Sequence, residues 1–234
     1  MAKTPSEPAA KPSSRSTATA QARKRLIAQA VIEILAREGS RALTHRRIDA
    51  HLGLPQGATS YYFPRWFELL KSGFNKLFED SLEDFDRCYA PVVRRLEADQ
   101  PIDVDLVAAS AHRHWRSVTR SSRRDLAIAR FEFYLLAAHD PKLMALQRER
   151  RRGLFDLTTA AFAALGCRNA RRAAAEFSSR IQGDYISHFI APSFSQPERT
   201  VADFAARIRQ IATDSDAVPA DRSPVPKIAP LIAI

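Results

Sequence analysis

The chain has 234 residues, of which 45% are hydrophobic and 26% are charged, so it can bury a sizeable core and should be globular. Its formal net charge of +10 is uneven: residues 1–65 hold 11 basic and 4 acidic groups, which predicts a polyanion, or less simply a membrane surface, as the partner of this part. Two cysteines, no apolar run of about 18 residues and no apolar leader argue against a disulfide framework, a zinc site, a membrane span and secretion, and favour a cytoplasmic protein.

The first 20 residues are rich in proline, serine, threonine and alanine and have few large apolar groups. Such a composition predicts a disordered basic arm over residues 1–20. A helix is predicted to follow, because apolar residues recur there at helical spacing until Gly39 ends the pattern. The apolar positions of this helix are Leu26, Ile27, Val31, Ile34 and Leu35.

Residues 44–63 form a pattern of two short helices joined by a tight turn. Ile48 and Leu52 give the first segment an apolar stripe, and Thr44 stands before it as a candidate N-cap. Gly53 tolerates a left-handed turn, and Pro55 favours the start of a second helix over residues 56–63. The spacing alone fits an ordinary helical corner equally well, but a second helix rich in polar and aromatic groups favours a helix-turn-helix.

The combined segments EILAREG, THRRIDAHLGLPQGATSYYF and ELL resemble the tetracycline-repressor (TetR) family of bacterial transcription regulators. The resemblance runs from Arg25 to about Leu70 and is weaker in ARFEFYLLAAHDPKL. It implies an all-α fold, with a helix-turn-helix DNA-binding domain over residues 21–66 and a helical regulatory and dimerisation domain over residues 67–212. It also implies that a homodimer reads a double-stranded, palindromic operator and responds to a small-molecule effector.

The resemblance implies which residues contact DNA. Phosphate or backbone contacts are expected from Thr44, His45, Arg46, Tyr62 and Arg65, base contacts from Gln56, Ala58, Ser60 and Tyr61, and close approach at Gly57. Glutamine can pair with adenine, and an alanine methyl can pack on thymine. Three positions depart from the usual pattern: Asp49 replaces a small residue and is predicted to cap the third helix, Ser60 replaces a tyrosine, and Trp66 replaces a basic residue.

Helical patterns continue through the rest of the chain. One or two helices are predicted over residues 66–99, with a break or kink at Pro91. Further helices are predicted over 104–118, 125–138, 141–165, 169–190 and 198–212, followed by a loose tail over 213–234. Asp184 and His188, four residues apart, favour a helical ion pair over a metal site, and no metal or cofactor is expected.

A pocket and an interface are predicted in the regulatory part. The pocket is expected where aromatic and polar groups gather on three helices, although aromatic residues at this spacing also suit a plain core. Its candidate residues are His112, Trp115, Arg130, Phe131, Glu132, Tyr134 and Phe155. The last two helices are expected to form a four-helix bundle with a second subunit. The candidate interface residues are Phe177, Ile181, Tyr185, Phe204 and Ile208.

Three classes of function can be compared with the sequence: an enzyme, an interaction adaptor and a transcriptional regulator. No glycine-rich phosphate loop, H-E-x-x-H motif or nucleophile elbow is present, so the chain is not expected to be an enzyme. A helical interaction adaptor without specific DNA binding is the alternative that Ser60 and Trp66 keep open. The favoured reading is a ligand-responsive, DNA-binding transcriptional repressor.

Overall fold

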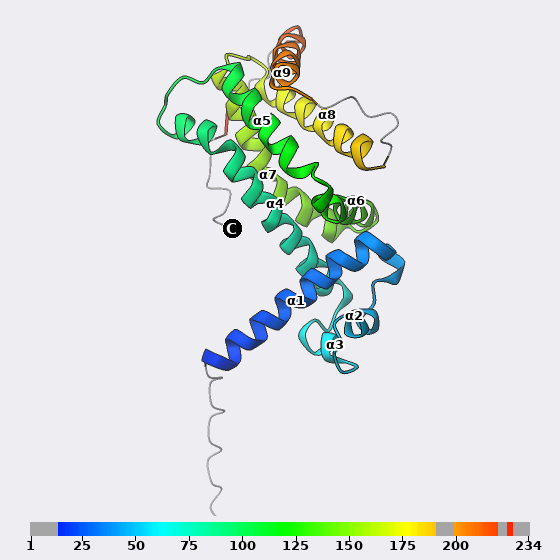
Figure 1. Ribbon diagram of the computed structural model, residues 1–234. Coiled ribbons are helices and arrows are strands. Elements are labelled where there is room, and N and C mark those ends of the chain that lie inside the picture. The colour runs from blue at the N-terminus through cyan, green and yellow to red at the C-terminus, as the bar shows by residue number, and fades with distance from the viewer. Residues whose placement is uncertain (1–13, 191–198, 220–223, 227–234) are drawn as a thin grey trace, which may run out of the picture.

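The computed structural model describes residues 14–190, 199–219 and 224–226, and this part of the chain is built from α-helices, two 3-10 turns and their connections. In Figure 1, α1–α3 lie at one end, α8 and α9 lie at the other, and the long helix α4 runs between them. The helices are α1 (Ser14–Glu38), α2 (His45–His51), α3 (Ala58–Tyr62), α4 (Trp66–Glu97), α5 (Val104–Val118), α6 (Arg124–His139), α7 (Pro141–Ala164), α8 (Ala170–Ile190) and α9 (Val201–Asp216), with 3-10 turns η1 (Ser40–Ala42) and η2 (Ser121–Arg123).

Two hydrophobic clusters hold the helices together. The first joins α1 and α2 to α4, and it extends to Ala129 and Phe133 of α6 and to Leu143 and Leu146 of α7. The second lies among α4, α5, α7, α8 and α9, with Phe204 and other large side chains at its centre. Because α4, α6 and α7 contribute to the first cluster, the N-terminal helices share their core with the larger C-terminal part.

Gly73 sets the close contact between α1 and α4. It is buried, and a β-carbon added there would lie 2.4 Å from Cγ1 of Val31 and 3.4 Å from Cζ of Phe133. The absent side chain lets the two helices approach where Phe133 of α6 also packs. Helices α1, α4 and α6 therefore meet at Gly73, and α1 packs against both of the others.

The first helix begins earlier than its apolar pattern predicted. Residues 14–20, expected to be disordered, form the start of α1, while residues 1–13 lie outside the described part. Ala18, Ala20 and Ala22 favour helix, and adding residues to an existing helix costs much less than nucleating one. In Figure 1 this end of α1 extends beyond the other helices, on the same side of the molecule as α3.

Pro91 lies inside a single helix and does not end it. Helix α4 continues through the proline to Glu97, with Tyr89 and Val92 buried on either side. Nη2 of Arg113 on α5 donates to the Cys88 carbonyl at 3.1 Å, in the turn where proline disturbs the regular hydrogen bonds. Packing of the helix on both sides of Pro91 therefore holds it together across the predicted break, although the Arg87 carbonyl lacks the N–H partner that proline cannot supply.

The C-terminal helix α9 begins at Val201, later than predicted, and ends at Asp216 instead of residue 212, because its last turn is bonded to the start of α8. The Asp216 carboxylate accepts from the backbone N–H groups of Arg168 (3.2 Å) and Asn169 (3.0 Å). Nδ2 of Asn169 in turn donates to the carbonyls of Ser215 and Val218, at 2.9 and 2.8 Å. The tail predicted over 213–234 is therefore ordered at its beginning; residues 220–223 and 227–234 lie outside the described part.

Candidate nucleic-acid interface and ligand pocket

The helix pair α2–α3 is fixed by side-chain caps. Thr44, the predicted N-cap of α2, accepts from the Arg47 N–H at 3.1 Å. Helix α3 has five residues and follows Gly57, which has a left-handed φ of 91° and no side chain that could cap the helix. A helix this short is not stable alone, so its geometry depends on contacts with α2.

Asp49 supplies the missing cap, as the sequence predicted. Its carboxylate accepts from the N–H groups of Gly57 and Thr59, both at 2.8 Å, and from the Thr59 hydroxyl at 2.6 Å. Asp49 is 3% exposed and Thr59 is fully buried. Burial by itself raises the pKa of Asp49, but the hydrogen bonds from Thr59 and Gly57 outweigh it and hold the pKa of the carboxyl below its usual value.

The surface of the α2–α3 pair carries most of the residues expected to contact DNA. Tyr61 is 81% exposed, the highest exposure of the large hydrophobic side chains described. Its ring makes an edge contact with Tyr62, which is half-buried. Thr44, Arg46, Gln56, Gly57, Ser60 and Arg65 are exposed as well, and Ala58 is partly so. Helix α3 begins at Ala58 instead of residue 56, because Gly57 is left-handed, so Gln56 lies in the preceding turn.

His45, an expected contact residue, and Trp66, which replaces a basic residue of the usual pattern, both form hydrogen bonds within the fold. His45 Nε2 lies 2.7 Å from the Phe63 carbonyl, which links the start of α2 to the end of α3. Trp66 donates its indole N–H to the Leu43 carbonyl at 3.3 Å. Arg65 beside it is the N-cap residue of α4 and is exposed to solvent.

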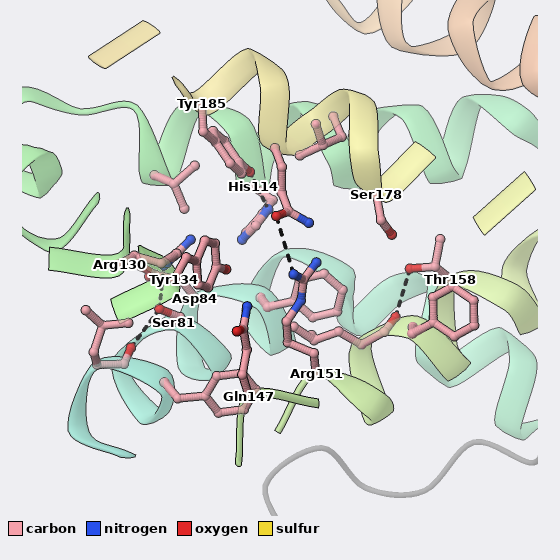
Figure 2. Close-up of a pocket in the computed structure, with 18 of the residues that line it drawn as sticks. Ser81, Asp84, His114, Arg130, Tyr134, Gln147, Arg151, Thr158, Ser178 and Tyr185 are labelled. Atoms are coloured by element: carbon pink, nitrogen blue, oxygen red, sulfur yellow. Dashed lines mark hydrogen bonds between the residues drawn. The ribbon is translucent and has the colours of Figure 1, made fainter. Parts of the chain in front are cut away.

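A cavity of about 850 Å³ lies in the C-terminal part, between α4, α5, α6, α7 and α8. Figure 2 shows Arg151 directed into it, with His114 and Tyr185 across the space and the Arg130–Ser81 pair at one end. Its aromatic lining consists of Phe74, Phe78, Phe85, Tyr89, Phe131, Tyr134, Phe155, Phe177, Tyr185 and Phe189. A volume in this range and a mostly apolar wall with a few polar groups are typical of small-molecule sites.

The cavity includes only part of the predicted pocket. Arg130, Phe131, Tyr134 and Phe155 line it, as predicted. Three other residues lie elsewhere, because each faces a different neighbour. His112 lies against Phe204 of α9, Trp115 stacks behind the wall on Tyr185, and Glu132 accepts from the Ser40 N–H at 3.2 Å, beside α1.

The sequence prediction missed His114, Arg151 and Tyr185. The ring of His114 points into the cavity, and its Nδ1 lies 3.2 Å from the Tyr185 hydroxyl. Burial, with a smaller contribution from the charge of Arg130, lowers the pKa of His114 to about 4, so the ring is neutral near pH 7. Because His112 and His114 are two residues apart on a helix, they face different sides. This spacing does not indicate which side faces the cavity.

Four of the five candidate interface residues are buried within the chain's own fold, and Ile181 is half-buried. Phe204 and Ile208 are each 1% exposed and pack in the second hydrophobic cluster. Phe177, Ile181 and Tyr185 line the cavity. The apolar stripes of α8 and α9 thus face the subunit's own core, because α4, α5 and α7 cover them. The four buried residues therefore offer little surface to a second copy of the chain, and the contact between subunits stays a prediction.

The predicted Asp184–His188 ion pair does not form. Asp184 binds the guanidinium groups of Arg199 and Arg207 and so ties α8 to α9, whereas His188 Nε2 lies 3.2 Å from the Thr119 carbonyl. No cluster of three or more metal-ligating side chains occurs in the described part of the chain. Within those same residue ranges, no helix is both long and apolar enough to cross a membrane.

Comparisons with known proteins agree with this architecture. Residues 103–214 match the family model of the tetracyclin repressor-like C-terminal domain. A comparison with curated protein sequences gives no significant match. A transcriptional regulator from Rhodococcus sp. Rha1 has a similar structure, with a TM-score of 0.68 and 19% identity, over 84% of this chain and 99% of that one.

Two further similar structures were solved with small molecules. One is a putative transcriptional regulator from Saccharomonospora viridis in complex with choline, with a TM-score of 0.59, 16% identity and coverage of 82% of this chain and 96% of that one. The other is the multidrug binding protein EbrR with malachite green, with a TM-score of 0.59, 18% identity and coverage of 81% and 97%. Residues 103–214 thus match a tetracyclin repressor-like C-terminal domain, and the described chain as a whole has the fold of these similar structures.

Proposed function

We propose that the protein is a homodimeric repressor that binds a palindromic DNA operator through α3 and leaves it when a small molecule occupies the cavity. The observation that carries the proposal is a connection: Phe74 and Leu77 of α4 belong to the core shared with α1 and also line the cavity. A ligand that moves these side chains therefore acts on the packing of the DNA-binding end.

Exposure and charge at the α2–α3 end support DNA binding. Tyr61 and Ser60 on α3, and Gln56 in the turn before it, offer exposed hydrogen-bonding groups on a short helix that Asp49 caps. Arg46 and Arg65 are exposed beside them and suit phosphate contacts. A single helix-turn-helix of this size buries too little surface for high sequence specificity. This favours a dimer whose two helix-turn-helix units bind a two-fold symmetric DNA site.

The outer faces of α8 and α9 replace the interface predicted from sequence. On α8, Ala175, Ser179 and Gly183 are exposed and small, and Ile186 and Ile190 follow them at 45% and 60% exposure. On α9, the exposed positions include Ala202 and Ala206. Small residues allow close helix packing, and the two isoleucines give apolar area to bury. We therefore assign the subunit contact to these faces, with an isologous four-helix arrangement.

The route from the cavity to the DNA-binding end runs through α4 and α6. Beyond the shared core, Arg37 of α1 donates to Asp125 of α6 at 3.0 Å, and Ser40 bonds Glu132 of the same helix. Arg130, between these two positions, lines the cavity. A ligand needs a coupling free energy of only about 1–3 kcal/mol to change operator affinity 5- to 150-fold. The choline and malachite green bound by two proteins of similar structure support a small organic molecule as the effector.

Selection of bound sequences from a random duplex library tests the DNA part. The selected operator should bind with a steep negative dependence on salt concentration. Tyr61→Ala should weaken operator binding by about 1–3 kcal/mol and binding to random duplex much less. Leu135→Ala, at another exposed apolar position on α6, is the control and should change neither. If no sequence is enriched and the salt dependence is flat, the adaptor alternative replaces this proposal.

Calorimetry tests whether ligand binding releases the protein from the operator. A ligand that raises the melting temperature should bind more weakly when operator duplex is present, and the operator should bind more weakly by the same factor when the ligand is present. A stabilising ligand whose affinity is identical with and without operator would leave a DNA-binding protein without ligand control.

A further inference from the structure

Charge in the cavity is unevenly divided. Two acidic side chains, Asp84 and Asp156, line it, against six arginines: Arg123, Arg130, Arg148, Arg151, Arg152 and Arg171. His114 is neutral near pH 7 and adds no positive charge. Arg148, Arg152 and Arg171 are exposed, whereas Arg123, Arg130 and Arg151 are half-buried. The inner part of the site is therefore cationic and partly shielded from water.

The buried acid Asp84 is already neutralised. Its Oδ2 lies 2.6 Å from Nη2 of Arg123, and its Oδ1 lies 3.0 Å from Nη2 of Arg87. The Asp84 side chain is only 2% exposed. Two guanidinium groups thus share one carboxylate, so Asp84 does not provide a free negative charge for a cationic ligand.

Arg130 and Arg151 have only neutral partners. Arg130 donates from Nη2 to the Ser81 hydroxyl at 2.6 Å, and Arg151 donates from Nη1 to Oε1 of Gln182 at 3.3 Å. The Arg151 guanidinium also lies 5.8 Å from the centre of the Tyr134 ring. Neither forms an ion pair with a carboxylate in the described part of the chain. Half-buried guanidinium groups are much better satisfied by an anion, which they can bind in a two-pronged, charge-assisted manner.

The aromatic lining and the size of the cavity indicate the chemistry of the uncharged part of the ligand. The aromatic rings around Arg130 and Arg151 come from α4, α6, α7 and α8, and the cavity is large enough for a drug-sized molecule. We propose that the cavity selects an organic anion: a drug-sized aromatic or apolar molecule with one carboxylate, which Arg130 and Arg151 bind. The proposal rests on the effector role proposed above and opposes the charge of choline, the ligand of one similar regulator.

Three pyrene probes of matched body and different charge test the proposal with the full chain. These are 1-pyrenebutyrate, 1-pyrenebutanol and 4-(1-pyrenyl)butylammonium, with binding followed by fluorescence anisotropy. Pyrenebutyrate should bind about 10- to 100-fold more tightly than the alcohol, the ratio that charge-assisted hydrogen bonds provide, and the cation should bind most weakly.

Substitutions locate the anion contact. Arg130→Gln and Arg151→Gln should each lower pyrenebutyrate affinity about tenfold or more and leave pyrenebutanol affinity unchanged, which also shows that the pocket remains folded. Arg148→Gln is the matched control, because Arg148 lines the same cavity from an exposed position. It should change neither affinity by more than about twofold, because exposed charges are screened by solvent.

The outcomes separate this inference from the proposed function. Equal affinity for the three probes, or tightest binding of the cation, would overturn the anion selectivity and leave the cavity as an effector site. If Arg148→Gln and Arg130→Gln lowered the affinity for pyrenebutyrate equally, the direct contact between Arg130 and the carboxylate would be refuted. The overall positive charge of the cavity would then explain the selectivity. If none of the probes binds, the inference fails, whereas the effector role of the cavity is decided by the calorimetric titration with operator.

Discussion

Replacing Asp49 by alanine should damage the DNA-binding end selectively. The substitution removes three hydrogen bonds, two of which come from the N–H and the hydroxyl of the fully buried Thr59. An unsatisfied buried polar group costs about 1–3 kcal/mol, while the exposed Gly57 N–H can bond water instead. The expected loss in free energy of unfolding is therefore about 2–4 kcal/mol.

Two controls define what the loss means. Asp103→Ala removes an exposed N-cap from α5, where Asp103 accepts from the Leu106 N–H at 2.7 Å, and should cost only about 1 kcal/mol. Asp49→Asn keeps the shape but removes the charge and should fall between the wild type and Asp49→Ala. Urea unfolding gives the free energies, and hydrogen exchange should show lost protection at the Thr59 amide. Operator affinity should fall with it.

Acid adds an independent check on the same carboxyl. The pKa of Asp49 is lower in the folded state than in the unfolded state, so its contribution is present above the unfolded pKa, about 3.9, and is lost as pH falls through the lower folded value. Asp49→Asn should therefore show a smaller loss of stability below about pH 4 than the wild type. Equal losses in Asp49→Ala and Asp103→Ala, with Thr59 still protected, would refute the reasoning.

Three further predictions concern other parts of the fold. Gly73→Ala should lower the free energy of unfolding by about 1–3 kcal/mol in urea titration, because its β-carbon would collide with Val31. His114 has a folded pKa of about 4 against about 6.5 unfolded, so the wild type should lose stability as pH falls from 6.5 to 4, and His114→Gln should lose less; parallel curves would contradict this. Ile186→Asp should give monomers in sedimentation, whereas Leu135→Asp, at another exposed apolar position, should remain dimeric; a dimeric Ile186→Asp would place the contact elsewhere.

The sequence by itself determined the positions of the helices after residue 100 to within a few residues. Local signals suffice there: Asp140 caps α7 through the N–H groups of Lys142 and Leu143, and Gly166 has the positive φ that ends a helix. The role of Asp49 as a cap was also predictable, because the position before α3 lacks a side-chain acceptor. These features depend on residues close together in the chain.

Only the tertiary structure decided what each helix face meets. An apolar stripe predicts burial, but it does not distinguish the subunit's own core from a second subunit, which is why Phe204 and Ile208 were assigned to an interface. Likewise, His112 and His114 both lie on α5, and only the positions of α9 and of the cavity give the first a packing role and the second a pocket role. The same holds for Arg151, because a run of arginines is typical of a solvated helix face and only the fold places this one at the cavity. Helix periodicity fixes the angle between side chains, whereas their surroundings depend on helices that are distant in sequence.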